Sequence, residues 1–284
     1  MPRPTSAHSR RQSRAAVTGN QAVRRAISVL KTFDDQSPEL GVTEVSRRLD
    51  LHKSTVYRLL SAFEDEGLIA RNPDNGRYRL GPELIVLGEL VLRHTDVHRV
   101  ALPFLRDLAD ETGETVDLEI LSGPNVITIE EIAGRHVVTA AGAIGRPWAA
   151  HATSTGKVLL AELPPAFRAQ ILRRQLKRFT SGTVTDPALV LRELERVERV
   201  GYAVSSSELE EHLVAVAAPI RGRHGQAVAA VSLSGPDTRF TRAALPSLIK
   251  RCCDTAATIS AGLGYVPPAR RALNRAPATA HPAL

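Results

Sequence analysis

The sequence predicts an α+β protein of two domains, a small basic N-terminal domain and a larger mixed one. Three short amphipathic segments and a strong turn signal follow one another between residues 21 and 82. Beyond residue 97, short apolar runs and amphipathic segments follow without a regular strand–helix–strand alternation. That pattern is typical of helices packed on an antiparallel sheet. The 284 residues suffice for two domains of ordinary size.

The positive charge of the chain is concentrated in its first domain. Residues 1–82 carry 14 Lys and Arg against nine Asp and Glu, whereas the rest of the chain carries 23 against 21. A basic domain joined to a nearly neutral one favours a polyanion as the partner of the first domain alone.

The sequence carries no sign of export, of a membrane span or of a metal site. The first twenty residues are basic but lack the apolar core of a secretory signal. No apolar stretch approaches the roughly 20 residues that cross a bilayer. The only cysteines, Cys252 and Cys253, are adjacent, and two cysteines alone build neither a disulfide framework nor a zinc site. We expect a cytoplasmic protein with no membrane partner, no metal and no cofactor.

The first domain has the element order of a winged helix-turn-helix. A helical pattern starts at Gln21, a short helix follows the N-capping residue Thr43, and a third helix runs from about 54 to 66 and ends at Gly67. The next residues, LIARNPDNGRYRLG, predict two short strands around the turn at 73–76. Three short helices and a hairpin within about 60 residues are typical of this DNA-binding motif.

The third helix has an apolar face for packing and a polar face suited to DNA. Arg58 can donate two hydrogen bonds to a guanine edge, while Ser54, Thr55 and the helix N-terminus suit a phosphate oxygen. Taken singly, each polar residue fits a solvated surface equally well. Helix order, hairpin and basic charge together predict binding to double-stranded DNA. The candidate contacts are Lys53, Ser54, Thr55, Tyr57 and Arg58 on the helix and Arg71, Arg77 and Arg79 on the hairpin.

The stretch HATSTGKVLL, residues 151–160, has the Gly-Lys pair of a phosphate-binding loop but not the rest of it. Such a loop needs glycine at position 151 and Ser or Thr at position 158, where this chain has His151 and Val158. This excludes a nucleotide site. The remaining feature is a helix start made of small residues, whose free backbone N–H groups favour a carboxylate.

No other residues form a convincing catalytic or metal-binding set. His94 and His98 have the one-turn spacing of a metal pair, but no third ligand is evident. No G-x-S-x-G elbow is present. We therefore assign no catalytic residue and expect no enzyme activity. Two other functions stay open: an enzyme that the basic domain localises to DNA, and a nucleoid protein that binds DNA without an effector. The first lacks a nucleophile or cofactor loop, and the second leaves the large second domain unexplained.

Several separated segments resemble one family of regulators. RRAISVLKTF and VTEVSRRLDLHKSTVYRLLSAFEDEGLIARNPDNGRYRLGPELIVLG are similar to the N-terminal domain of IclR-type bacterial transcriptional regulators. The Lys-Ser-Thr-x-x-Arg-Leu-Leu run and the Gly-x-Tyr-x-Leu-Gly wing ending are its most telling parts. The likeness continues through GETVDLEIL, HATSTGKVLLAEL, GYAVSSSELEEHLVAVAAPI and AVAAVSLSGP, and it covers about 22–265.

The resemblance implies a sequence-specific transcription regulator, a repressor or an activator, whose second domain senses a small metabolite. We expect an organic acid as effector and a homodimer or homotetramer bound to a palindromic operator. The expected organisation is a disordered basic arm over 1–20, a winged helix-turn-helix over 21–82, a linker helix over 83–97, a GAF/profilin-like α/β effector-binding domain over 98–265, and a disordered tail over 266–284.

The resemblance also implies an effector pocket in the second domain. One wall comes from the helix start at Ser154 and Thr155, and the opposite wall from Ser232 and Ser234, which alternate on one strand face and can donate to the same anion. The alternative for these two serines is an ordinary strand position with hydrogen bonds to the backbone. The remaining candidate lining residues are Trp148, Ser205 and Ala215.

Overall fold

The computed structural model describes residues 20–34, 36–94, 96–136 and 144–267, apart from the side chains of 92–94. The predicted arm and tail lie outside these ranges except for residues 20, 266 and 267. The chain divides into two compact units between Val91 and Leu92, and the predicted boundaries at 82 and 97 lie on either side of this point. Among the described residues, no helix is long and apolar enough to cross a membrane.

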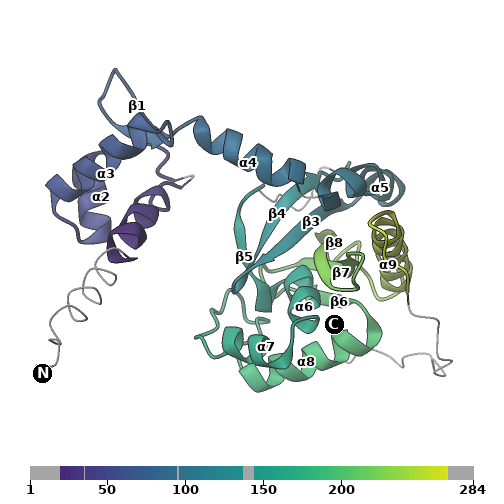
Figure 1. Ribbon diagram of the computed structural model, residues 1–284. Coiled ribbons are helices and arrows are strands. Elements are labelled where there is room, and N and C mark those ends of the chain that lie inside the picture. The colour runs from purple at the N-terminus through teal and green to yellow at the C-terminus, as the bar shows by residue number, and fades with distance from the viewer. Residues whose placement is uncertain (1–19, 35, 95, 137–143, 268–284) are drawn as a thin grey trace, which may run out of the picture. The chain divides into compact units, whose positions relative to one another are not determined.

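The N-terminal unit is a winged helix-turn-helix, as predicted (Figure 1). Its first helix is described from 20 to 30, and α2 (Val42–Leu49) and α3 (Lys53–Asp65) follow. The wing is an antiparallel hairpin of β1 (Ile69–Arg71) and β2 (Tyr78–Leu80). A small core of buried side chains joins these elements, among them Val29, Leu40, Val45, Val56, Leu60, Ile69 and Tyr78.

Of two helix termini predicted from the sequence, the C-terminus of α3 is confirmed and the N-cap of α2 is wrong. Gly67 has a positive φ of 71° and follows α3, as expected of a C-terminal glycine. The N-cap of α2 is Gly41 and not Thr43, which lies inside the helix. The reason is Glu44, whose carboxylate accepts a hydrogen bond from the Gly41 N–H at 2.8 Å and so completes the first turn two residues earlier.

Helix α4 (Glu83–His94) is apolar over much of its circumference. Several of its large apolar side chains are 46–71% exposed within the single chain, namely Ile85, Val86, Leu87, Leu90 and Val91. A run of exposed apolar side chains of this kind is typical of an interaction surface.

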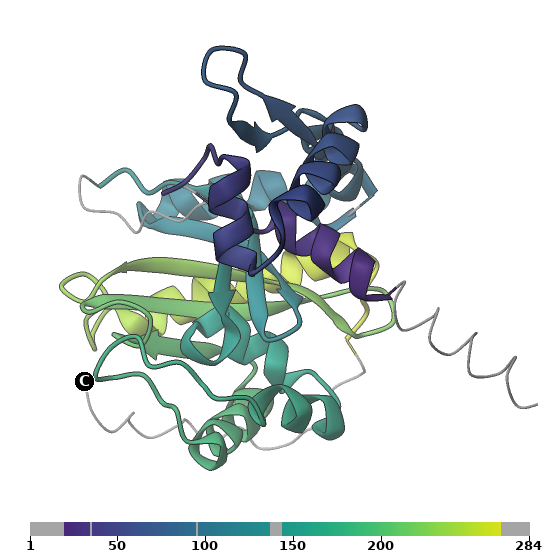
Figure 2. The same ribbon diagram turned by 90° about the vertical axis from the view of Figure 1, so that its left-hand side faces the viewer.

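The C-terminal unit is built on a six-stranded antiparallel sheet with the order β5-β4-β3-β8-β7-β6. Its strands are β3 (Thr115–Ser122), β4 (Asn125–Ile132), β5 (Pro147–Ala149), β6 (Ala203–Ser206), β7 (Leu213–Arg221) and β8 (Ala227–Pro236). Helices α5 (Asp96–Thr112) and α9 (Leu245–Gly262) cover one face, while α6 (Ser154–Ala161) and α8 (Pro187–Val200) pack on the other, with α7 (Pro165–Leu172) beside them (Figures 1 and 2). The predicted α+β fold is confirmed.

Each strand divides its side chains between two cores, because successive residues point to opposite faces. On β8, Val231 and Leu233 lie in the core under α5 and α9. Ala230 lies in the core under α6 and α8. Ser232 and Ser234 follow Ala230 on that second face, where apolar packing stops and a polar pocket begins.

Candidate functional site

Helix α3 has the division of faces that a DNA-reading helix needs. Val56 and Leu60 have no exposed surface and fix the helix to the domain core. The Thr55 side chain is partly buried. Four predicted contact residues are exposed on the outer face: Lys53, Ser54, Tyr57 and Arg58. Their arrangement allows base and phosphate contacts in a major groove.

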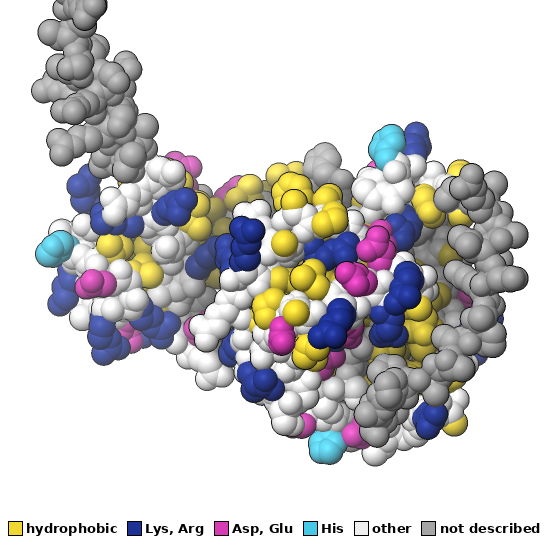
Figure 3. All heavy atoms as spheres, turned by 90° about the horizontal axis from the view of Figure 1, so that it is seen from below, with side chains coloured by type: hydrophobic (Ala, Val, Ile, Leu, Met, Phe, Trp, Pro, Cys, Tyr) yellow, Lys and Arg dark blue, Asp and Glu magenta, His cyan; other side chains and the backbone are white. Residues whose placement is uncertain are grey.

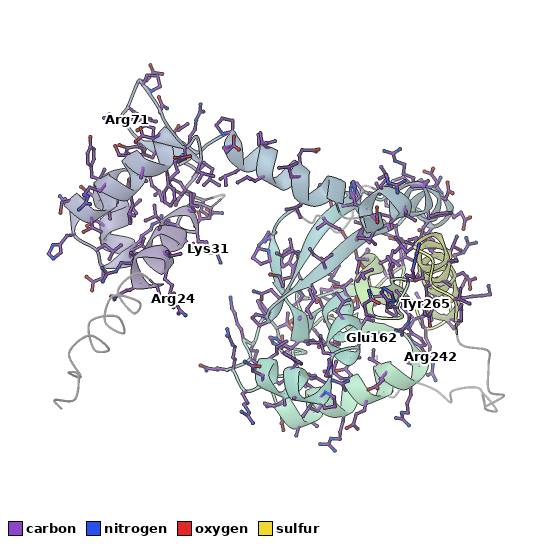
Figure 4. All side chains as sticks on the ribbon, in the orientation of Figure 1. Arg24, Lys31, Arg71, Glu162, Arg242 and Tyr265 are labelled. Atoms are coloured by element: carbon purple, nitrogen blue, oxygen red, sulfur yellow. The ribbon has the colours of Figure 1, made fainter. Side chains whose placement is uncertain are left out.

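The three wing arginines differ in their surroundings. Arg71 and Arg79 are exposed, and Figure 4 shows Arg71 on the hairpin. Arg77 instead connects the wing to the start of α2, because its Nη2 lies 2.7 Å from Glu44 Oε2 and donates to the Glu39 carbonyl at 2.9 Å. The sequence did not indicate this internal role. Lys and Arg side chains are spread over the surface of this unit in Figure 3.

The C-terminal unit contains a cavity of about 90 Å³ between the N-terminus of α6 and the sheet. It collects all seven residues that the sequence named for an effector pocket: Trp148, Ser154, Thr155, Ser205, Ala215, Ser232 and Ser234. The strand register explains this, because Ala215 of β7 lies opposite both Ser205 of β6 and Ser234 of β8. The structure thus brings these residues together; their part in binding a ligand is a proposal below.

Gly156 and Lys157 position α6 over the sheet rather than bind a phosphate. A Cβ atom on Gly156 would lie 2.2 Å from the carbonyl oxygen of Ala150, so only glycine permits this approach. The N-capping residue is Thr153, whose Oγ1 accepts from the Gly156 N–H at 3.1 Å. At the other end, Glu162 Oε1 accepts from Arg221 Nη2 at 2.6 Å (Figure 4 labels Glu162).

Lys157 has no exposed surface and is held by two carboxylates. Its Nζ lies 2.8 Å from Glu193 Oε1 on α8 and also donates to Glu208 Oε1. Glu208 belongs to the segment that leads into the pocket wall at Leu209 and Glu210. The Lys157 ammonium group, which in the sequence suggested a phosphate-binding lysine, is therefore paired with two carboxylates of the protein itself.

Asp117 and Glu119 of β3 face the pocket, two residues apart on the same side of the strand. Ser232 and Ser234 donate to Asp117 Oδ2 at 3.3 Å and 3.2 Å. The alternative of backbone-bonded serines is therefore incorrect. Their hydroxyls are engaged by a carboxylate that the sequence did not single out.

Glu119 is held by two hydroxyl groups, one on each carboxylate oxygen. Thr128 of β4 donates to its Oε1 at 2.8 Å, and Thr155 at the start of α6 donates to its Oε2. The side chain of Glu119 is 6% exposed. A carboxyl group of this chain thus engages the Thr155 side chain at the helix start that the sequence predicted for a ligand's carboxylate.

Burial raises the pKa values of both acids, since the charged form loses its hydration. For Asp117, desolvation and the like charges of Glu119 and Glu131 raise the pKa to about 8, against the donated hydrogen bonds of Ser234 and Ser232. Desolvation also raises the pKa of Glu119, which the hydroxyls of Thr155 and Thr128 lower.

Comparison with known proteins identifies the family. The model for the bacterial transcriptional regulator IclR C-terminal domain matches residues 89–261, and that for the IclR helix-turn-helix domain matches 22–73. The HTH-type transcriptional regulator XynR of Escherichia coli is 35% identical over 246 residues, which is 86% of this chain and 98% of XynR. The chain belongs to the IclR family of bacterial transcriptional regulators.

Further IclR relatives agree in sequence and fold. The regulator KipR of Bacillus subtilis is 33% identical and covers 87% of this chain, with 98% of KipR matched. The crystal structure of Thermotoga maritima IclR has a TM-score of 0.66 at 30% identity and covers 86% of this chain and 99% of its own. An IclR homologue from Microbacterium hydrocarbonoxydans in complex with 4-hydroxybenzoate has a TM-score of 0.73 at 28% identity, over 85% of this chain and 98% of its own.

Family membership settles the class of function. The curated relatives are named as transcriptional regulators and not as enzymes, and this chain is an IclR-type regulator with a helix-turn-helix DNA-binding domain and an IclR C-terminal domain.

Sequence reasoning missed the acids that line the cavity. Asp117 and Glu119 stand in TVDLEIL, a strand pattern whose other residues are mostly apolar. Two charged residues at alternate positions of such a strand were the available signal, since Asp and Glu are rarely buried unless they are paired. Thr128 and Glu210 also line the cavity and were not predicted.

The described residues give no support to a metal site at His94 and His98. His98 Nε2 lies 2.7 Å from Glu130 Oε2, and the side chain of His94 lies outside the described residues. Within the described part of the chain, no group of three or more His, Cys, Asp or Glu residues is placed to hold a metal ion.

Proposed function

We propose that this IclR-family regulator is a cytoplasmic homodimer, or a pair of dimers, that binds a palindromic operator and responds to a small metabolite. The metabolite binds in the cavity between α6 and the sheet. The observation that carries this proposal is the cavity itself, where the hydroxyls of Ser154 and Ser205 line the wall, are 2% and 7% exposed, and have no hydrogen-bond partner among the described residues. Hydroxyl groups that line a cavity without a protein partner are available to a ligand, since each can donate or accept a hydrogen bond.

The position of the cavity suits a regulatory ligand. Its lining comes from the N-terminus of α6, from all six strands of the sheet and from the segment at 209–210. A ligand that contacts all of these stabilises one arrangement of them over another, and only such differential binding can change the affinity for DNA. The sequence predicts an organic acid as the ligand. Whether the pocket favours an anion depends on the charges of the residues that line it.

Dimerisation supports operator binding because one α3 reaches only one half-site. The exposed apolar side chains of α4, such as Ile85 at 71%, offer a surface for the same helix of a second chain. A symmetric pair then reads two inverted half-sites whose centres lie about 34 Å, or a multiple of it, apart.

Selection of bound duplexes from a random DNA pool tests the proposal with the full-length protein. We expect enrichment of an inverted repeat with half-sites one or more helical turns apart. The enriched duplex, used with a library of small metabolites, then gives ligands that change its affinity for the protein. Enrichment of no sequence, or equal affinity for enriched and random duplexes, would contradict operator binding.

A further inference from the structure

We propose that the pocket takes a small organic cation, whose ammonium-type group lies beside Asp117 and Glu119, instead of the carboxylate expected from the sequence. The inference rests on the proposed function only in that this cavity is the effector site. It names the charge class of the ligand.

The charges of the lining carry the proposal. Three acids line the cavity, Asp117, Glu119 and Glu210, and the described lining contains no Lys, Arg or His. The nearest internal ammonium group of α6, on Lys157, is already bonded to Glu193 and Glu208. An anionic ligand would find no positive charge here and would oppose ionisation of these acids, whereas a cation would supply the missing opposite charge and favour their ionised form.

The helix start gives an independent argument. The N-terminus of an α-helix favours negative charge, and here Glu119 accepts from the Thr155 hydroxyl of the first turn. The N–H of Gly156 is likewise taken, by Thr153 Oγ1. A ligand carboxylate aimed at this helix start would lie beside the Glu119 carboxyl group and would compete with it for the Thr155 hydroxyl.

The uncharged residues of the lining indicate the chemistry of the rest of the ligand. The unpartnered hydroxyls of Ser154 and Ser205 suit hydroxyl groups of the ligand, since each can donate or accept. Apolar carbon can lie against Trp148, Leu209 and Leu213. A cavity of about 90 Å³ has space for roughly six to nine water-sized groups. A hydroxylated amine of this size fits.

A bare metal ion fits less well than an organic cation. Calcium requires about six to eight oxygen ligands around one point. Among the described residues, no group of three or more His, Cys, Asp or Glu side chains could hold a metal ion. Both Glu119 oxygens and one Asp117 oxygen are also engaged by hydroxyl donors.

The raised pKa values agree with this charge arrangement. Desolvation raises the pKa of Asp117 to about 8 and also raises the pKa of Glu119, as expected of acids buried without an opposite charge. A cation placed beside them lowers both pKa values, so its binding stabilises the ionised acids.

Three probes of the same shape test the charge class. Calorimetric titration of the full-length protein at pH 7.5 uses 3-aminopropane-1,2-diol as cation, glycerol as neutral control and glycerate as anion, each up to about 100 mM. We expect the cation to bind at least about tenfold more tightly than glycerate. Asp117→Asn and Glu119→Gln should each remove that preference, while Asp254→Asn, an exposed acid of α9, should keep it.

The outcomes separate this inference from the proposed function. Tighter binding of glycerate, a cation preference retained in the Asp117→Asn, Glu119→Gln double variant, or no binding of any probe would overturn it. Binding of magnesium or calcium chloride that excludes the amine would also overturn it in favour of a metal site. The wild-type comparison needs no variant to fold, and circular dichroism checks the variants. If only an anion alters operator binding, the proposed regulatory function is supported and the cationic ligand class is wrong. If no operator is found while the amine binds through Asp117, the cationic ligand class is supported and the proposed operator binding is wrong.

Discussion

Lys157 and Glu208 form an ion pair in the interior of the effector domain, at the junction of two pocket walls. The Lys157 ammonium has no exposed surface, and it donates to Glu208 Oε1 while Glu193 accepts from it at 2.8 Å. The ammonium belongs to α6, and Glu208 directly precedes the lining residues Leu209 and Glu210. The pair therefore couples the position of α6 to the segment that lines the pocket at Leu209 and Glu210.

Replacing Lys157 with methionine should destabilise the protein strongly. The substitution keeps the apolar stem but leaves Glu208 buried without its opposite charge, which costs about 3–5 kcal/mol. Urea unfolding at pH 7, followed by circular dichroism, measures the loss. Lys250→Met serves as control, because Lys250 is exposed and its change should stay within about 0.5 kcal/mol. Equal effects of the two substitutions would show that the buried pair is not a structural link.

Gly156→Ala should also destabilise, in contrast to the same change elsewhere in a helix. The added Cβ would lie 2.2 Å from the Ala150 carbonyl oxygen, so α6 must shift away from the sheet at a cost of about 1–3 kcal/mol. Gly88→Ala in α4 has nothing within 4 Å of the new Cβ and should gain about 0.5–1 kcal/mol from helix propensity. Thermal unfolding distinguishes the opposite signs, and a shared sign would contradict the close approach of α6.

Asp117→Asn should stabilise the ligand-free protein increasingly as the pH rises. The unfolded chain loses the Asp117 proton near pH 3.9, whereas the folded chain keeps it to about pH 8. Between these values the folded state binds more protons, so its unfolding free energy falls with rising pH. Asparagine carries no such proton, and its advantage should grow by roughly 1–3 kcal/mol from pH 5 to pH 7. Denaturant unfolding at both pH values, with Asp254→Asn as control, measures this. A difference independent of pH would contradict the raised pKa.

The sequence predicted the fold and the location of the pocket better than its chemistry. Alternation placed Ser232 and Ser234 on one face, and the helix start at Ser154 was visible locally. The partners of Lys157, Glu193 and Glu208, lie 36 and 51 residues away, so no local pattern shows that the Gly-Lys pair is internal. The acids beside the serines were equally hidden, because Asp117 meets Ser234 only through pairing of strands 117 residues apart.

Ile85→Lys should convert the proposed dimer to monomers. Ile85 is 71% exposed in the single chain, and burial of its side chain between two α4 helices contributes about 1.5–3 kcal/mol per protomer. A symmetric interface loses two such contributions. The dissociation constant should therefore rise by about two orders of magnitude or more. Light scattering over a dilution series measures it. Leu189→Lys, 46% exposed on α8, should leave the dimer intact; loss of the dimer in that variant alone would place the interface elsewhere.

Arg58 and Arg77 should differ in how they affect operator binding. Arg58 is exposed on α3 and free to reach a base edge, so Arg58→Ala should cost about 1–3 kcal/mol on the selected operator and relax its sequence preference. Arg77 donates to Glu44 and to the Glu39 carbonyl, so Arg77→Ala should loosen the wing and weaken binding to operator and random duplexes alike. Fluorescence anisotropy titrations with both duplexes, at several salt concentrations, give the two affinities. If Arg58→Ala weakens both duplexes equally and flattens the salt dependence, Arg58 contacts only phosphate.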